Sequence, residues 1–153
     1  FSSGIEIKGA FCPLKPFRNS EYCYVAEGFA TAASIQLAFP DIPAICVFNA
    51  GNILPAIEHI RAINPKIKIM IAADKDQPDK KGEKAGEKYA ILASKRFSGV
   101  CFRIVKFETN NPSWTDFNDL HQFESLDRVK EQLTIDPAEF TEILCLGYKG
   151  DQY

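Results

Sequence analysis

Short apolar runs alternate with helix-forming segments through most of this sequence, and this alternation constrains the fold more than any other feature. Buried strands are expected at residues 22–26, 44–48, 67–73 and 99–105. Helices are expected at residues 28–39, 53–63, 80–97 and 119–133. Strands and helices that alternate at this spacing form βα units, so we expect an α/β fold with a mostly parallel central sheet of about four strands flanked by helices.

The two ends of the sequence are less regular. Residues 5–14 alternate weakly and contain Gly9 and Pro13, so we expect one or two short edge strands there. Residues 107–119 form a polar connection, and residues 140–146 could be a late strand or a helix. We expect one domain over residues 1–153 with its core at about 22–121. We also expect a piece of a longer protein, because the sequence begins at Phe1 rather than at a methionine.

Acidic residues follow two of the predicted strands directly. Glu27 ends the run Tyr-Val-Ala-Glu, and Asp74 and Asp76 end the run Ile-Met-Ile-Ala-Ala-Asp-Lys-Asp. Because an extended chain alternates its side chains, Asp74 and Asp76 point the same way and could share one cation. Ligands bind in open α/β sheets where the strands end. Magnesium is commonly held by one or two carboxylates together with substrate phosphates, so this pattern predicts phosphate chemistry; a solvated loop is the alternative.

Glu27 and Gly28 lie between a predicted strand and an alanine-rich helix. Gly28 allows the backbone to turn tightly and to approach a ligand. Glu27 could simply complement the dipole of the helix that follows it. Next to the two aspartates it is also a candidate general acid or base.

Two further segments carry candidate ligands. Lys80, Lys84 and Lys88 lie one turn apart on a predicted helix, where they could form a solvated face or, for Lys84 near the helix start, reach a phosphate. Asp116 follows the fourth predicted strand, where it could cap the next helix or serve as a further metal ligand. Trp114 beside it is expected to pack rather than to stack on bases.

Several other functions are excluded by motif and composition. The sequence contains no phosphate-binding loop of the form G-x-x-x-x-G-K-[ST], no G-x-G-x-x-G after a strand and no G-x-S-x-G. A calcium loop beginning at Asp74 fails because Pro78 and Ala85 occupy ligand positions. A net charge of -2 argues against a general polyanion-binding surface, so any nucleic-acid contact should be local or metal-mediated.

The five cysteines are widely spaced and occur without a C-x-x-C pair. This usage is typical of small buried residues in a reducing cytoplasm rather than of disulfides, and zinc is not expected with only two histidines present. No apolar stretch reaches transmembrane length, so we expect a cytoplasmic protein without a membrane partner.

The order of these segments resembles the Toprim domain shared by primases, topoisomerases and some nucleases. The resemblance covers residues 22–121 and rests on a strand followed by Glu27-Gly28, a strand followed by Asn-Ala-Gly-Asn at 49–52, and a strand followed by Asp74-Lys-Asp76. The lead-in at 8–14 and the segment 115–121 look like the primases and primase-helicases of phages and mobile elements.

The resemblance implies roles for individual residues. Glu27 would be the catalytic acid or base, and Asp74, Asp76 and Asp116 would bind Mg²⁺, for which Mn²⁺ could substitute. Asn49 and Gly51 would line the nucleotide or phosphate site. The partners implied are a single-stranded DNA template, nucleoside triphosphates and a helicase domain or protein.

The function implied is Mg²⁺-dependent nucleotidyl transfer, the synthesis of an RNA primer by a DNA primase. One alternative is a Toprim nuclease that hydrolyses phosphodiesters with the same acids. Another is a non-catalytic module that binds nucleic acid or protein. A topoisomerase is not expected, because it needs a nucleophilic tyrosine on separate DNA-gating domains and a chain of this length could not hold them.

Overall fold

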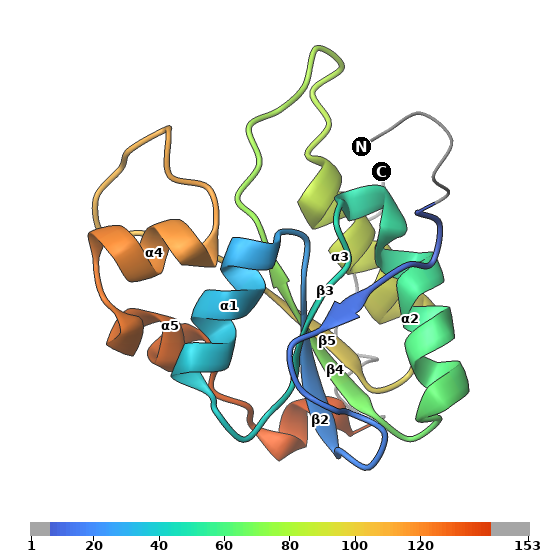
Figure 1. The fold of residues 1–153 in the computed structure, drawn as a ribbon. Helices are drawn as coiled ribbons and strands as arrows, with labels where there is room; N and C mark the ends of the chain where they lie inside the picture. Colours follow the sequence, from blue (N-terminus) through green and yellow to red (C-terminus); the bar gives the residue numbers. More distant parts are fainter. Residues whose placement is uncertain (1–6, 142–153) are drawn as a thin grey trace.

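The protein folds into three layers, with one sheet between two layers of helices (Figure 1). The computed structural model describes residues 7–141. Its sheet has five strands in the order β1-β3-β2-β4-β5, and β2, β3, β4 and β5 run parallel, whereas β1 is antiparallel to β3. The predicted α/β fold with a mostly parallel sheet is therefore confirmed. The strands are β1 (Cys12–Pro13), β2 (Tyr22–Ala26), β3 (Ala44–Cys46), β4 (Lys68–Ala73) and β5 (Val100–Ile104).

Five α-helices cover the two faces of this sheet, and two short 3₁₀ segments accompany them in the described part of the chain. They are α1 (Phe29–Ala38), η1 (Ala50–Asn52), α2 (Ile53–Ile63), α3 (Ala85–Arg96), α4 (Phe117–Phe123), α5 (Leu126–Leu133) and η2 (Pro137–Phe140). No helix among these is long and apolar enough to cross a membrane.

Each central strand contributes alternate side chains to two separate cores. In β4, Ile69 and Ile71 pack in the core formed with α2 and α3, whereas Met70 and Ala72 pack in the core formed with α1, α4 and α5. All four side chains are buried. This is the burial pattern expected for a parallel strand covered on both faces, where an apolar run has no polar side.

Four predicted boundaries are corrected by the structure. The edge strand predicted at 5–14 is reduced to β1, and its first two residues lie outside the described part. The helix predicted from Lys80 begins only at Ala85, because Asp79 Oδ1 accepts hydrogen bonds from the backbone N–H groups of Lys81 and Glu83 and holds a turn there. Lys80 therefore does not share a helix face with Lys84 and Lys88.

The other two corrections concern the end of the chain. The helix predicted at 119–133 is two helices, because Ser125 caps a new helix by accepting a hydrogen bond from the Arg128 backbone N–H. Of the segment predicted at 140–146, Phe140 ends η2, and residues 142–146 lie outside the described residues.

None of the cysteines at positions 12, 23, 46 and 101 forms a disulfide in the described part of the chain, and Cys23 and Cys46 are buried, as predicted.

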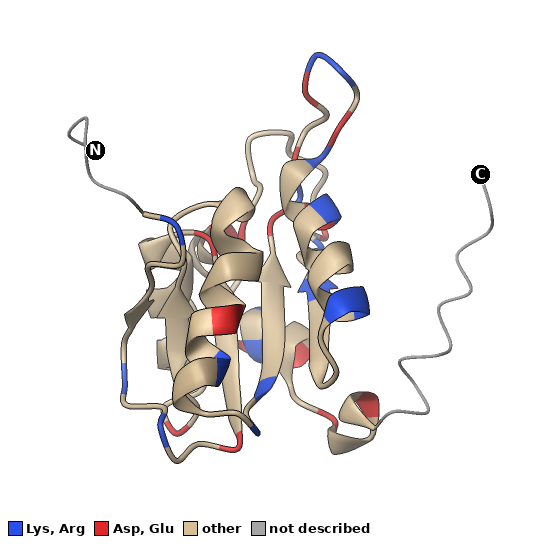
Figure 2. Cartoon of the chain, turned by 90° about the vertical axis from the view of Figure 1, so that its right-hand side faces the viewer, with Lys and Arg blue, Asp and Glu red and all other residues tan. Residues whose placement is uncertain are grey.

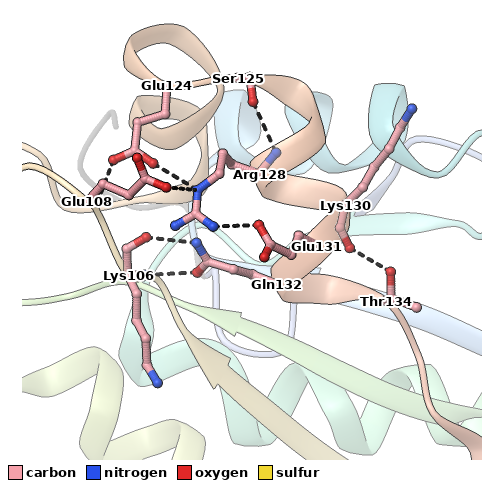
Figure 3. A network of polar contacts seen from close by, with 9 residues as sticks. All are labelled: Lys106, Glu108, Glu124, Ser125, Arg128, Lys130, Glu131, Gln132 and Thr134. Carbon is pink, nitrogen blue, oxygen red and sulfur yellow. Dashed lines mark hydrogen bonds and ion pairs between the residues drawn. The ribbon is translucent and has the colours of Figure 1, made fainter.

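The Arg128 side chain connects two segments of the chain, as shown in Figure 3. It contacts Glu108, Glu124 and Glu131 and so joins the start of the connection after β5 to α5.

Candidate functional site

The candidate acids lie at the carboxyl ends of two neighbouring strands. Strands β2 and β4 pair in parallel with Ala26 opposite Ala72, so Glu27 and Asp74 leave the sheet at the same edge. Helix α1 then covers one face of the sheet, and the segment after β4 leads to α3 on the opposite face. The chain thus diverges around the end of β2, which is the position at which open α/β sheets bind ligands.

Glu27 and Asp76 meet at the first turn of α3. A Cβ atom placed on Gly86 would lie 2.6 Å from Glu27 Oε1 and 2.7 Å from Asp76 Oδ2, closer than any real side chain allows. The backbone N–H of Gly86 also donates a hydrogen bond to Asp76 Oδ2. A side chain at position 86 would therefore force both carboxylates to shift, because they approach the helix backbone directly.

Burial and mutual repulsion perturb two of these acids. Burial, with the charges of Asp76 and Asp116, raises the pKa of Glu27 from 4.5 to about 7. Burial, with the charges of Glu27, Asp116, Asp76 and Asp119, raises the pKa of Asp74 from 3.8 to about 8. Glu27 Oε1 and Asp74 Oδ1 are also buried without a hydrogen-bond partner. The site is thus a set of converging carboxylates that lacks a compensating positive charge.

Asp116 caps α4, which packs with α1 and α5 on one face of the sheet, and joins this group from there. Its Oδ1 accepts a hydrogen bond of 2.8 Å from the Asp119 backbone N–H, and Asp119 Oδ2 accepts one from the Asp116 backbone N–H. This is a reciprocal capping box. The backbone N–H of Lys75 donates to the Thr115 carbonyl over 2.7 Å and ties the cap to the loop between Asp74 and Asp76. The cap alternative from the sequence is confirmed, and the same residue lies within electrostatic range of Glu27 and Asp74.

The predicted phosphate-binding residues lie at two different places. Gly28 is the N-terminal cap of α1, and no side chain caps that helix. Lys84 is the corresponding residue of α3, two positions before Gly86, and its ammonium forms an ion pair of 3.2 Å with Glu87. Both residues adjoin the carboxylates.

Asn49 and Gly51 line a separate open pocket of about 570 Å³ together with Lys8 and Arg96. None of the four acids lines this pocket. Asn49 also caps η1, because its side chain accepts a hydrogen bond from the Asn52 backbone N–H. The role of Asn49 and Gly51 at the nucleotide or phosphate site stays a prediction.

Sequence reasoning missed two residues that shape the site. Gly86 left a signal, since it is a glycine in the first turn of a helix that follows two aspartates. Cys46 left none: its thiol donates to the Glu27 carbonyl over 3.4 Å and anchors the turn that carries Glu27 to β3. That contact depends on the pairing of β2 with β3.

Two observations bear on whether these carboxylates could hold a hard cation. Among the described residues, no group of three or more histidine, cysteine or acidic side chains is arranged to hold a metal ion. Mg²⁺, however, usually keeps several waters and takes only one or two protein carboxylates with substrate phosphates. The unpartnered oxygens of Glu27 and Asp74 are the groups that a cation would compensate.

The fold and this site define a Rossmann-like α/β domain with an acidic centre at the carboxyl edge of its sheet. A family model described as a Toprim domain matches residues 22–127. The chain therefore belongs to the Toprim family. Domains of this family occur in metal-dependent nucleic-acid enzymes, among them primases, nucleases and topoisomerases, and they generally bind Mg²⁺. No curated protein matched the sequence.

Proposed function

We propose that this chain is the catalytic domain of a DNA primase, in which it performs Mg²⁺-dependent nucleotidyl transfer to synthesise an RNA primer on single-stranded DNA. The observation that carries the proposal is the convergence of Glu27, Asp74, Asp76 and Asp116, in which the pKa values of Glu27 and Asp74 are raised and an oxygen of each lacks a partner. Such an arrangement is costly in a folded protein and is typical of a functional site. The choice of primase within the family rests on the resemblance of residues 8–14 and 115–121 to the primases of phages and mobile elements.

Asp74, Asp76 and Asp116 would hold Mg²⁺, and Mn²⁺ could substitute for it. The bound ion would supply positive charge to phosphate oxygens as negative charge develops on them. Gly86 orients one of these ligands, because its backbone N–H holds Asp76 Oδ2 in place. The Asp116 cap and the contact between Lys75 and Thr115 hold the two ligand-bearing loops together.

Glu27 would accept the proton of the attacking primer 3′-hydroxyl. A general base must be ionised to accept a proton, and a cation held by Asp76 and Asp116 would lower the pKa of Glu27, which burial and these two acids raise in the metal-free protein. Cys46 fixes the backbone of Glu27 through its thiol, and Gly86 leaves room for its carboxylate.

Gly28 and Lys84 would contact phosphates of the nucleoside triphosphate. The first backbone N–H groups of α1 carry no side-chain cap, and Lys84 adjoins the carboxylates with its ammonium partly exposed. Asn49 and Gly51 would bind a more distant part of the nucleotide or template in their own pocket. A helicase domain or protein would supply the single-stranded template.

The test follows two reactions under the same conditions. The protein is incubated with Mg²⁺, a single-stranded DNA template and labelled ribonucleotides, and separately with end-labelled single-stranded and duplex DNA. We expect primer synthesis that is lost in Asp74→Asn and retained in Glu131→Gln, an acid paired with Arg128 away from the site. Cleavage without synthesis would replace this proposal with a nuclease. The absence of both synthesis and cleavage would favour a non-catalytic module.

A further inference from the structure

An exposed stack of aromatic rings lies beside the carboxylate site. The rings of Trp114 and Phe123 are parallel, with centroids 4.7 Å apart and 6° between their planes. Phe107 contacts Trp114 in a tilted arrangement, with ring centroids 5.8 Å apart and 54° between the ring planes. Phe123 is the outer ring, and 54% of its surface is exposed. The sequence-based expectation that Trp114 only packs does not account for this exposed outer ring.

The stack adds little to the cores of the protein. Phe107 packs against the core of α1, α4 and α5, but neither Trp114 nor Phe123 belongs to either core. Phe117, six residues before Phe123, fills that core and is completely buried. Helix α4 thus buries one phenylalanine and exposes another, so the exposed ring has a different role from the buried one.

The stack is held firmly with respect to the candidate ligands. Trp114 precedes Thr115, whose carbonyl accepts the hydrogen bond from Lys75, the residue between Asp74 and Asp76. Asp116 then caps the helix that carries Phe123. These contacts fix the position of the aromatic stack relative to the carboxylates.

The other end of the connection is fixed by the contacts in Figure 3. Glu108 donates its backbone N–H to Glu124, the residue after Phe123, over 2.7 Å. The Lys106 backbone exchanges two hydrogen bonds with the Gln132 side chain, and Arg128 joins Glu108 to Glu124. A rigid, exposed aromatic surface can bind a flat ligand without an ordering cost.

We propose that the Trp114–Phe123 stack is a platform on which a nucleobase of the single-stranded substrate stacks, beside the carboxylate centre. The proposal rests on the proposed function, since the family to which the chain belongs acts on nucleic acids. Base stacking on an aromatic side chain suits a strand of any sequence, because every base has a flat face. The net charge of the protein is -2, so stacking would supply affinity that a general cationic surface does not.

The test uses Trp114, which is the only tryptophan of the sequence. Its emission is followed during titration with a single-stranded oligothymidylate and with an abasic phosphodiester of the same length and charge, in Mg²⁺ and again in EDTA. We expect quenching and tighter binding with the oligothymidylate in at least one of the two buffers. Equal responses to both probes, or no response to either, would overturn the platform.

Variants of Phe123 separate stacking from folding. Phe123→Leu keeps an apolar side chain and should weaken oligothymidylate binding about tenfold while leaving abasic binding unchanged. Phe123→Tyr should restore it. Leu37→Ala, which removes another exposed apolar side chain from α1, is the matched control and should bind as the unchanged protein does. Wild-type affinity in Phe123→Leu would overturn the proposal.

Failure of the stacking proposal can be distinguished from failure of the proposed function. If Asp74→Asn abolishes a metal-dependent reaction but base preference is absent, the platform fails and the proposed function stands. If base preference is present but neither primer synthesis nor cleavage occurs, the proposed function fails.

Discussion

Two groups of acidic side chains in this protein differ in what neutralises them. Glu108, Glu124 and Glu131 converge on the guanidinium of Arg128, whose pKa is raised first by its hydrogen bond with Glu124 and then by the one with Glu131. At the carboxyl edge of the sheet, burial and neighbouring acids raise the pKa values of Glu27 and Asp74, and an oxygen of each lacks a partner. The first group is a structural network.

The difference shows that acidic density alone does not identify a site. What distinguishes the carboxyl edge is uncompensated charge held in place by the backbone. Figure 2 shows acidic and basic residues together in the projecting loop that follows β4. If the acids at the carboxyl edge are functional and those around Arg128 are structural, substitutions in the two groups should have different effects.

The largest effect is expected from Gly86→Ala. The new Cβ would displace the carboxylates of Glu27 and Asp76, and a displacement of about 1 Å in a catalytic group can reduce the rate about a hundredfold. Alanine favours the helix, so the stability should not fall through helix propensity. Metal-dependent turnover should be compared with that of Ala85→Ser, an exposed position one residue earlier. Equal rates would show that the contacts at Gly86 do not matter.

The next effect concerns pH and the metal-free protein. Because the pKa of Asp74 is raised from 3.8 to about 8, the folded protein holds a proton that the unfolded chain has released above pH 4. The free energy of unfolding should therefore decrease as pH rises from about 4 to 8, by at most about 1.4 kcal/mol per pH unit for each such proton.

Asp74→Asn should remove much of this dependence and should stabilise the protein in EDTA more at pH 8 than at pH 5. Urea unfolding at pH 5 and pH 8 measures both quantities. Glu131→Gln, at the compensated group, should not stabilise the protein. A variant Asp74→Asn that is less stable than the unchanged protein at pH 8 would contradict the raised pKa.

A smaller effect separates the two roles of Asp116. Asp116→Ala removes the cap of α4 and should cost about 1 kcal/mol of stability. Asp116→Asn keeps a good cap and removes the charge, so it should retain stability and lose metal-dependent activity. Ser125→Ala, which removes the cap of α5, is the control that should lose stability alone. Full activity in Asp116→Asn would reduce Asp116 to a capping residue.

The smallest effect is expected from Arg128→Gln. This change leaves Glu108, Glu124 and Glu131 without their shared partner, so the melting temperature should fall slightly at low salt and by less at high salt. Turnover per folded molecule should not change. A loss of turnover larger than the loss of folded protein would show that this network also serves the site.

The sequence predicted those features that depend on local pattern. The apolar runs of β2 and β4 and the bounds of α2, which ends before Asn64-Pro65, were all readable from the residues. The meeting of Glu27 with Asp74 followed because carboxyl ends of parallel strands share an edge. Their catalytic and metal-binding roles remain predictions.

The features that escaped prediction depend on contacts between distant segments or on side-chain caps. Helix α3 begins later than predicted because of the turn at Asp79, and Ser125 sets the break between α4 and α5. The role of Gly86 required knowing which carboxylates approach it, and the Cys46 contact required the register of β2 with β3. The roles of Asn49 and Gly51 were assigned by resemblance and stay predictions; both residues line a pocket with Lys8 and Arg96.

Calorimetric titration of Mg²⁺ and Mn²⁺ at pH 8 in the presence of a nucleoside triphosphate shows whether the carboxyl edge of the sheet binds a cation. The unchanged protein is compared with the double variant Asp74→Asn, Asp76→Asn and with Glu131→Gln. We expect binding to the unchanged protein and to Glu131→Gln, and none to the double variant beyond that of the nucleotide itself. Equal binding in all three, or no binding in any, would contradict it.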